Sequence, residues 1–432
     1  MRFITLQPWS RPLARPLGGI AATALFLLGA CNRPQPAADA DLVAEIESIR
    51  AIDNHAHPVR PTASGEKPDT EYDALPVDSL EAQSDYVRSR PGSPALLAAH
   101  RALFQGDKAA AAKTYGQEYA LKVLDQLNIE TMLANRVAMG PGLPSPRFLW
   151  VPFADALMYP LATDSLVQNP DQKAFFALEA KLLARYYAES GVATKPVTLD
   201  QYLDQVVRAT LERHKKDGAV AEKFEMAYLR PLAIGNPAKS AAEKVYATGA
   251  GDYRALQDYI FRFIAVECGR LGMAVHFHTG AGGGGYFNVG GSNPMLLEPL
   301  FNDPSLRKTN FVMLHGGWPF AHEETALLTK PNAYLDFSAQ TFMNYPRDVA
   351  QNLRAWLEYV PEKVLFATDA YAYAPPAAGW EEVGYVANAS GREALGMALT
   401  AMLRDHEITR ERAGELARMV LRDNARKLYG LK

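Results

Sequence analysis

Short apolar segments alternate with longer helical segments along most of this chain, and this alternation constrains the fold more than any other feature. Eight segments have the length and the β-branched or aromatic content of buried strands: 51–53, 129–137, 147–152, 219–226, 273–278, 310–315, 333–337 and 364–368. Apolar strands separated by helices form parallel sheets through crossover connections. The pattern predicts an α/β fold, a (β/α)8 TIM barrel, with a doubly wound open sheet as the main alternative.

One domain accounts for most of the chain. With 432 residues and 48% hydrophobic side chains, the chain can bury a large core. Amphipathic periodicity predicts two helices, at 171–190 and 199–216, between the third and fourth strands. We therefore predict a barrel domain over residues 46–432 that carries a helical insertion at about 160–216.

The segment that precedes this domain is typical of a targeting signal. Residues 1–30 contain three arginines, no acidic residue and an apolar run at 20–28 that is too short to span a membrane comfortably. The run ends in Leu28-Gly29-Ala30-Cys31, which resembles the lipobox of bacterial lipoproteins. The resemblance implies a signal peptide at 1–30, lipidation of Cys31, and a tether at 31–45 that anchors the protein in the outer membrane, facing the periplasm. The alternative is an ordinary cleavable signal that contains a cysteine.

Charge and cysteine content argue against other classes of protein. A formal net charge of -3, with no long basic run, argues against nucleic acid as a partner. Apart from Cys31, the chain has one cysteine, Cys268, so a disulfide framework is excluded. No Gly-x-Ser-x-Gly motif surrounds a serine, which argues against serine hydrolase chemistry.

Five side chains that can bind metal end their strands in the same way. His55 and His57 close the first strand, and His278 closes the fifth. His315 and Asp369 close the sixth and the eighth. Functional groups of a TIM barrel lie at the C-terminal ends of its strands, so we expect these five side chains at one face of the barrel.

The chemistry of these side chains suits a divalent cation. His55 and His57 are two residues apart, so a strand points both rings to the same side, where they can reach one cation at about 2.0–2.1 Å. Four histidines and one aspartate favour Zn or another borderline ion. Any one of these histidines could be a satisfied core residue. Four of only nine histidines share this placement, however, and the joint pattern favours a metal site.

These residues make the sequence similar to the amidohydrolase superfamily of TIM-barrel, metal-dependent hydrolases. The resemblance extends from about residue 51 to the C-terminus, including a tail at 423–431 that resembles the closing helix of the family. Its strongest motifs are Asp53-Asn54-His55-Ala56-His57-Pro58, His278-Thr279-Gly280, Leu314-His315-Gly316-Gly317-Trp318-Pro319 and Ala367-Thr368-Asp369-Ala370. Within the superfamily, the chain looks nearest to the amidohydrolase domain of nodulin and FluG-type proteins.

The resemblance implies a role for each of the five side chains. His55 and His57 would bind the more buried metal. His278 and His315 would bind a second metal or orient the substrate. Asp369 would bind metal and act as the general base on the attacking water.

Lys223 determines the expected number of metals. Many family members carry a carboxylated lysine that bridges two metals, and Lys223 stands where this branch has a lysine followed five residues later by a tyrosine. A lysine between two glutamates is also a common solvated surface residue. The sequence therefore allows either one or two zinc ions.

The role of His276 is also open. It shares the face of His278 and could contact the substrate or pack in the core.

The resemblance implies that the protein hydrolyses an amide, lactone or ester C=O bond of a small molecule with a metal-activated water. Non-oxidative decarboxylation, which some relatives perform with one metal, is an alternative. A third reading, from another class, is a non-catalytic lipoprotein that binds a ligand. The sequence identifies neither the substrate-binding residues nor an oligomeric state.

Overall fold

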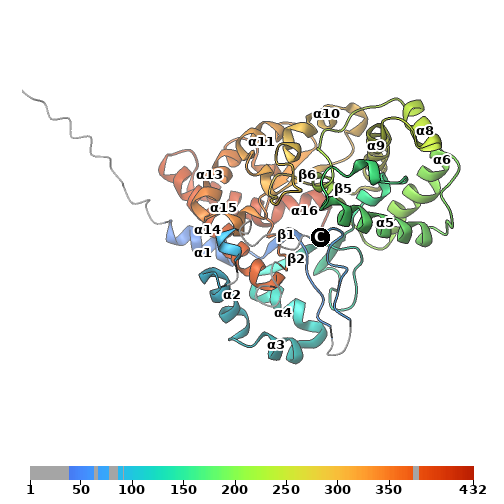
Figure 1. Ribbon diagram of the computed structural model, residues 1–432. Helices are drawn as coiled ribbons and strands as arrows, with labels where there is room; N and C mark the ends of the chain where they lie inside the picture. The colour runs from blue at the N-terminus through green and yellow to red at the C-terminus, as the bar shows by residue number, and fades with distance from the viewer. Residues whose placement is uncertain (1–37, 63–66, 77–85, 91, 373–378) are drawn as a thin grey trace, which may run out of the picture. The chain divides into compact units, whose positions relative to one another are not determined.

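The structure is a computed structural model that describes residues 38–62, 67–76, 86–90, 92–372 and 379–432 (Figure 1). The eight expected strands are all present, each at or close to its predicted range, and neighbouring strands pair in parallel. Their bounds are β1 Ala51–Ala56, β2 Ile129–Asn135, β3 Phe148–Val151, β4 Ala221–Phe224, β5 Ala274–His278, β6 Phe311–Leu314, β7 Ala333–Asp336 and β8 Val364–Leu365.

The strands close into a barrel, which excludes the doubly wound open sheet. Regular pairing gives a three-stranded sheet, β1-β2-β3, and a five-stranded sheet, β4 to β8. The amide of Lys223 donates to the carbonyl of Pro152 at 2.7 Å and joins β4 to the end of β3. At the other seam, the amide of Asp369 donates to the carbonyl of His55 at 2.8 Å. The fold is therefore the predicted (β/α)8 barrel.

Helices surround the barrel and fill the connections between its strands (Figure 1). Their bounds are α1 Ala40–Ser48, α2 Pro94–Phe104, α3 Lys108–Tyr115, α4 Tyr119–Gln126, α5 Gln172–Glu189, α6 Leu199–Tyr202, α7 Ala209–Lys216, α8 Lys239–Thr248, α9 Tyr253–Leu271, α10 Glu298–Phe301, α11 Ala321–Leu327, α12 Gln340–Met343, α13 Pro346–Leu357, α14 Trp380–Arg404, α15 Arg410–Arg418 and α16 Asn424–Tyr429. π-helical turns join α6 to α7 and α15 to α16.

Alternate residues of each strand pack on the two sides of the barrel wall. Phe224 and Phe277 point outward, and Phe224 contacts Phe261 of α9 with ring centroids 5.0 Å apart. Ala221 and Ala274 belong to an inner apolar cluster with Ile52 and Leu133. Because side chains alternate with period two, Lys223 and His276 share the inner face with these alanines. Both are fully buried.

The segment between β3 and β4 carries the helices α5, α6 and α7. Two buried tyrosines tie it to the chain that follows β3: Tyr186 donates to the carbonyl of Phe153 at 2.6 Å, and Tyr202 donates to the carbonyl of Leu157 at 2.7 Å. Their aromatic rings lie in the main core cluster. The insertion is thus packed onto the barrel close to the C-terminal end of β3.

The predictions for the N-terminal segment fall partly outside the described residues. The predicted signal peptide at 1–30 and the lipidated Cys31 lie outside them altogether. The helix α1 starts at Ala40 and buries Leu42 and Ile46, so the tether predicted for 31–45 does not extend to residue 45. Within the described part of the chain, no helix combines the length and apolarity that a membrane crossing requires.

Candidate metal centre

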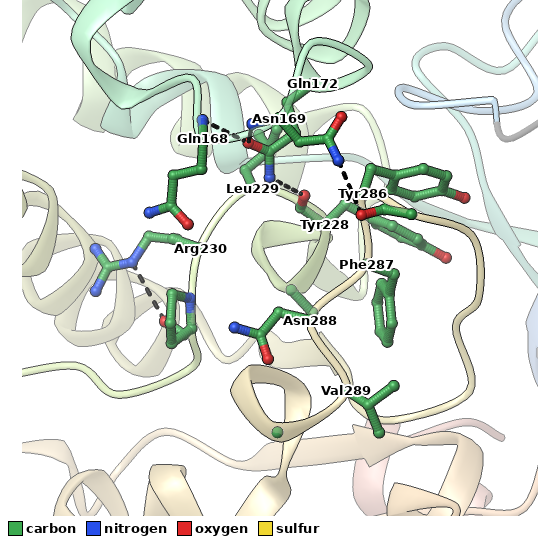
Figure 2. Close-up of a pocket in the computed structure, with 14 residues that line it drawn as sticks. Gln168, Asn169, Gln172, Tyr228, Leu229, Arg230, Tyr286, Phe287, Asn288 and Val289 are labelled. Atoms are coloured by element: carbon green, nitrogen blue, oxygen red, sulfur yellow. Dashed lines mark hydrogen bonds between the residues drawn. The ribbon is translucent and has the colours of Figure 1, made fainter.

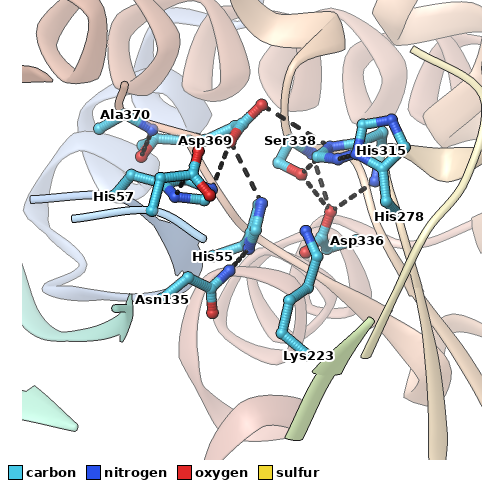
Figure 3. A network of polar contacts seen from close by, with 12 residues as sticks. His55, His57, Asn135, Lys223, His278, His315, Asp336, Ser338, Asp369 and Ala370 are labelled. Carbon is cyan, nitrogen blue, oxygen red and sulfur yellow. Dashed lines mark hydrogen bonds and ion pairs between the residues drawn. The ribbon is translucent and has the colours of Figure 1, made fainter. Parts of the chain in front are cut away.

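His55, His57 and Asp369 converge at the C-terminal end of the barrel (Figure 3). One donor atom from each of the three side chains lies within 4.8 Å of the other two. Nε2 of His55 is 3.2 Å from Oδ1 of Asp369, and Nε2 of His57 is 3.6 Å from the same oxygen. Two imidazole nitrogens and a carboxylate oxygen thus face one point, as the sequence predicted from the strand ends.

Hydrogen bonds behind the two rings turn their Nε2 atoms toward this point. Nδ1 of His57 donates to the carbonyl of Tyr72 at 3.1 Å, and the side-chain amide of Asn135 contacts Nδ1 of His55. The structure places the amide nitrogen Nδ2 of Asn135 against this ring and leaves Oδ1 without a partner in the described part of the chain. Exchanging the two amide atoms lets Oδ1 accept the Nδ1 proton, so that the lone pair of Nε2 of His55 is free to bind a cation. This Nε2 is buried and has no hydrogen bond among the described residues. An orphaned nitrogen beside a carboxylate fits a Zn-type cation.

Burial sets the protonation of these groups. It lowers the pKa of His57 to about 4 and depresses the pKa of His55 further below the usual histidine range. Both rings are therefore neutral at pH 7, the form in which imidazole binds metal. Burial also raises the pKa of Asp369, against the positive charge of Lys223. Asp369 has a positive φ of 54°, and 17% of its side chain is exposed, so solvent reaches this carboxylate.

His278 and His315 lie beside the first three donors and contact each other. Nδ1 of His278 is 3.1 Å from Nε2 of His315, and Nδ1 of His315 is 2.8 Å from the hydroxyl of Ser338. Nδ1 of His315 lies 3.9 Å from Oδ2 of Asp369 and thereby links this pair to the first group. The pair stands at the edge of the centre, as suits a second cation or the orientation of a substrate.

Lys223 lies at the middle of the centre. Figure 3 shows its side chain rising from β4 between His55 and Asp336. Its Nζ is buried and has no hydrogen bond among the described residues, and it is 3.6 Å from Oε1 of Glu225. The alternative of a solvated surface lysine is therefore wrong. Whether Lys223 is carboxylated stays a prediction.

Two acids that the sequence analysis missed hold this arrangement together. Asp336 ends β7, accepts the backbone amide of His315 at 3.0 Å and accepts the amide of Asn54 at 2.8 Å. Asp53 accepts the hydroxyl of Thr368 at 2.6 Å, next to Asp369. Asp336 was detectable from the sequence, because it stands at the C-terminal end of an apolar strand, near the position that Asp369 occupies after its own strand. Asp53 gave no such signal, since it lies inside β1.

A cavity of about 580 Å³ lies beside the centre (Figure 2). The insertion and the segments after β4 and β5 form its walls, with aromatic and amide side chains that include Gln168, Asn288, Tyr286 and Phe287. Tyr228 lines it and places its hydroxyl 3.5 Å from Nδ1 of His278. Arg230 also lines it, but its charge is paired with Asp258 at 2.6 Å. The cavity thus offers a neutral, partly aromatic surface.

Comparisons with known proteins agree with this geometry. The family model described as Amidohydrolase matches residues 52–431. Protein fluG of Emericella nidulans is 28% identical over 202 residues, which are 45% of this chain, and the chain spans only 22% of that relative's length.

Two solved structures share the fold at low identity. A protein assigned as a metal-dependent hydrolase, from Lactobacillus casei ATCC 334, has a TM-score of 0.55 and 15% identity over 90% of this chain and 97% of its own. Glucuronate isomerase from Caulobacter crescentus has a TM-score of 0.56 and 14% identity over 91% and 93%. Because the family model covers nearly all of the barrel, including all five strand-end side chains, this chain belongs to the amidohydrolase family.

Proposed function

We propose that this protein is a zinc-dependent hydrolase that cleaves the amide, lactone or ester C=O bond of a small molecule, with Asp369 as the general base. The observation that carries the proposal is the convergence of His55, His57 and Asp369 within 4.8 Å at the open end of the barrel. Similar folds also perform isomerisation, so the fold alone does not select hydrolysis.

The donor atoms support metal-assisted hydrolysis. A divalent cation held by His55, His57 and Asp369 would lower the pKa of a water molecule from 15.7 toward about 7 and would polarise a carbonyl group. Asp369 accepts the proton of the attacking water and returns it to the leaving group. Its partial exposure leaves one side of the carboxylate open to the reactants.

Groups next to the centre orient the substrate. His278, His315 and Tyr228 present ring nitrogens and a hydroxyl on the side that faces the cavity. The neutral, partly aromatic wall of the cavity suits an uncharged or aromatic group on the part of the substrate that does not react.

The test is hydrolysis of amide, dipeptide and lactone libraries by the zinc-loaded protein and by an Asp369→Asn variant. We expect turnover per bound zinc to fall by about 10²–10⁴-fold, because the general base is lost, while part of the zinc stays bound by His55 and His57. Asp348→Asn, which changes an exposed aspartate, is the control and should leave the rate unchanged. Release of CO2 without hydrolysis, or full activity in Asp369→Asn, would contradict the proposal.

The cellular location is a further part of the proposal. The lipobox-like motif at 28–31 supports lipidation of Cys31 and attachment to the cell envelope, with the barrel in the periplasm. Cys31→Ser should abolish labelling by a radioactive fatty acid and shift the protein from the membrane fraction to the soluble fraction. Unchanged labelling would refute this location.

A further inference from the structure

Four buried carboxyl groups lie near one another beside the candidate metal centre, and one of them, Asp73, faces the nitrogen of His57 that is turned away from Asp369. They come from four separate segments: Asp73 from the chain after β1, Asp155 from the turn after β3, Glu179 from α5, and Glu225 from the end of β4. We call them the inner acidic group. Their exposed fractions are 6%, 1%, 1% and 3% respectively, so water does not solvate their charges.

Contacts place these acids next to the metal centre. His57, Asp73 and Glu225 each offer one donor atom within 4.8 Å of the other two. Nδ1 of His57 is 3.6 Å from Oδ2 of Asp73, so the same ring faces Asp369 with one nitrogen and Asp73 with the other. Asp155 accepts the backbone amide of Glu225 at 2.7 Å.

Among the described residues, one ammonium group, that of Lys223, forms an ion pair with the inner acidic group. Lys223, 3.6 Å from Glu225, supplies one positive charge for four carboxyl groups. One oxygen of Asp155 and one of Glu225 are buried without a hydrogen bond among the described residues. Buried carboxylates are stable only when a proton, a cation or several hydrogen bonds compensate them.

Glu179 is a second, independent observation that points to a cation at this place. It comes from the insertion rather than from the barrel, and both of its oxygens are buried with no partner among the described residues. Burial raises the pKa of Glu179, and the charges of Asp155, Glu225 and Asp73 raise it further, so its carboxyl group lies near the other three. A helix that buries an unpaired carboxyl among three others fits a site for a cation.

We propose that Asp73 and Glu225 bind a second divalent cation, surrounded by the charges of Glu179 and Asp155. Two carboxylates, with water in the remaining positions, are ligands that Mg²⁺ and Mn²⁺ prefer. His57 stands between the two sites: its Nε2 serves the first, and its Nδ1 proton is held by the carbonyl of Tyr72. This inference does not rest on which bond the enzyme cleaves.

The proposed cation at Asp73 and Glu225 implies that Lys223 is an unmodified ammonium group and not a bridging carbamate. As an ammonium, Lys223 balances part of the charge of Glu225. A carbamate would add negative charge beside four carboxyl groups and Asp369. The second cation therefore depends on Asp73 and Glu225 and not on a modified Lys223.

The experiment loads the full chain with zinc, adds Mn²⁺, and measures bound Mn²⁺ by electron paramagnetic resonance and both metals by mass spectrometry. The wild type should bind one Mn²⁺ in addition to zinc. Asp73→Asn and Glu225→Gln should each abolish Mn²⁺ binding and retain zinc. Glu179→Gln, which removes a surrounding charge and no ligand, should weaken Mn²⁺ binding by about 10–100-fold.

Matched controls make each outcome decisive. Glu189→Gln changes a glutamate of the same helix that pairs with Arg185 and Arg213, and it should leave Mn²⁺ binding unchanged. Lys223→Ala should retain the second cation. The proposal is wrong if the wild type binds no second cation, if Glu179→Gln binds Mn²⁺ as the wild type does, or if Lys223→Ala loses it. Activity of Asp369→Asn tests the reaction separately, so the two proposals can fail independently.

Discussion

At the scale of single residues, Gly280 is a position where the metal centre depends on an absent side chain. Its φ is +54°, and a Cβ there would lie 2.0 Å from the carbonyl oxygen of Trp318. Its own carbonyl accepts a hydrogen bond from Nε2 of His278 at 3.0 Å. Gly280→Ala should therefore displace His278, lower the free energy of unfolding by about 1–3 kcal/mol and reduce the rate of turnover, because His278 orients the substrate. Chemical denaturation and steady-state kinetics would measure the two effects.

Gly283, in the same glycine-rich segment, is the matched control. Its backbone is not in the left-handed region, and a Cβ there would meet none of the described residues within 4 Å. Gly283→Ala should change neither quantity, and equal effects of the two substitutions would refute the argument. The sequence shows a run of similar glycines, and only the approach of the segment at 317–318 distinguishes Gly280 from its neighbours.

At the scale of elements, a buried ion network holds α3 against α14. Nζ of Lys108 lies 2.8 Å from Glu381 and 2.8 Å from Glu382, which are 6% and 0% exposed. Burial alone would raise the pKa of Glu382, but Lys108 and His100 together lower it below its ordinary value of 4.5. Lys108→Met should cost about 2–3 kcal/mol at pH 7, less than a fully buried pair because Lys108 is 27% exposed.

The pH dependence of this cost follows from the direction of the shift. Because the folded pKa of Glu382 is lowered, its contribution is complete above the unfolded pKa near 4.5 and is lost as pH falls through the folded pKa. The stability gap between the wild type and Lys108→Met should shrink below about pH 4. Lys113→Ala, which changes an exposed lysine of α3, is the control for thermal unfolding across this range. A gap that stays constant down to acid pH would contradict the assignment.

The bounds of the helix α14 were not predicted from the hydrophobic pattern of the sequence. Among the described helices it is the longest, yet its sequence pattern predicts no bounds, because most of its residues are buried and a narrow apolar stripe is absent. Gly384 and Gly391 lie on it, and their missing side chains let Ala370 and Phe366 approach. The strands were predictable because each is a short apolar run. The helix α14 is enclosed by α1, α2, α12 and α13, so its sequence has neither a short apolar run nor a clear division into apolar and polar faces.

At the scale of the whole barrel, a tyrosine of the last helix links that helix to two strands, β1 and β5. The hydroxyl of Tyr429 in α16 donates to Oδ1 of Asn54 in β1 at 2.5 Å and accepts from Nε2 of His276 in β5 at 2.8 Å. His276 is therefore a packed core residue beneath the centre. Tyr429→Phe leaves both partners unpaired and should lower the free energy of unfolding by about 1–3 kcal/mol.

Zinc content should not change in Tyr429→Phe, because the hydroxyl is not among the metal donors. Denaturant unfolding measures the stability, and Tyr359→Phe, at a residue 68% exposed, is the control. If Tyr429→Phe is as stable as that control, the hydroxyl does not stabilise the attachment of α16 to β1 and β5.

The sequence predicted the barrel and the place of its candidate metal ligands more fully than it predicted what surrounds them. Strand-end residues such as His55 and Asp369 are found by position, because parallel strands end at one face. Asp73 and Glu179 lie far apart in the chain and come near each other because the insertion packs onto the barrel. Their partnership is a long-range property, and no local spacing encodes it.

The most direct test of the account is a crystal structure of the zinc-loaded protein with anomalous diffraction measured at the zinc edge. The account predicts a zinc peak bound by Nε2 of His55, Nε2 of His57 and the carboxylate of Asp369. A fully active protein without zinc at this position, or a zinc peak bound by other residues alone, would contradict it.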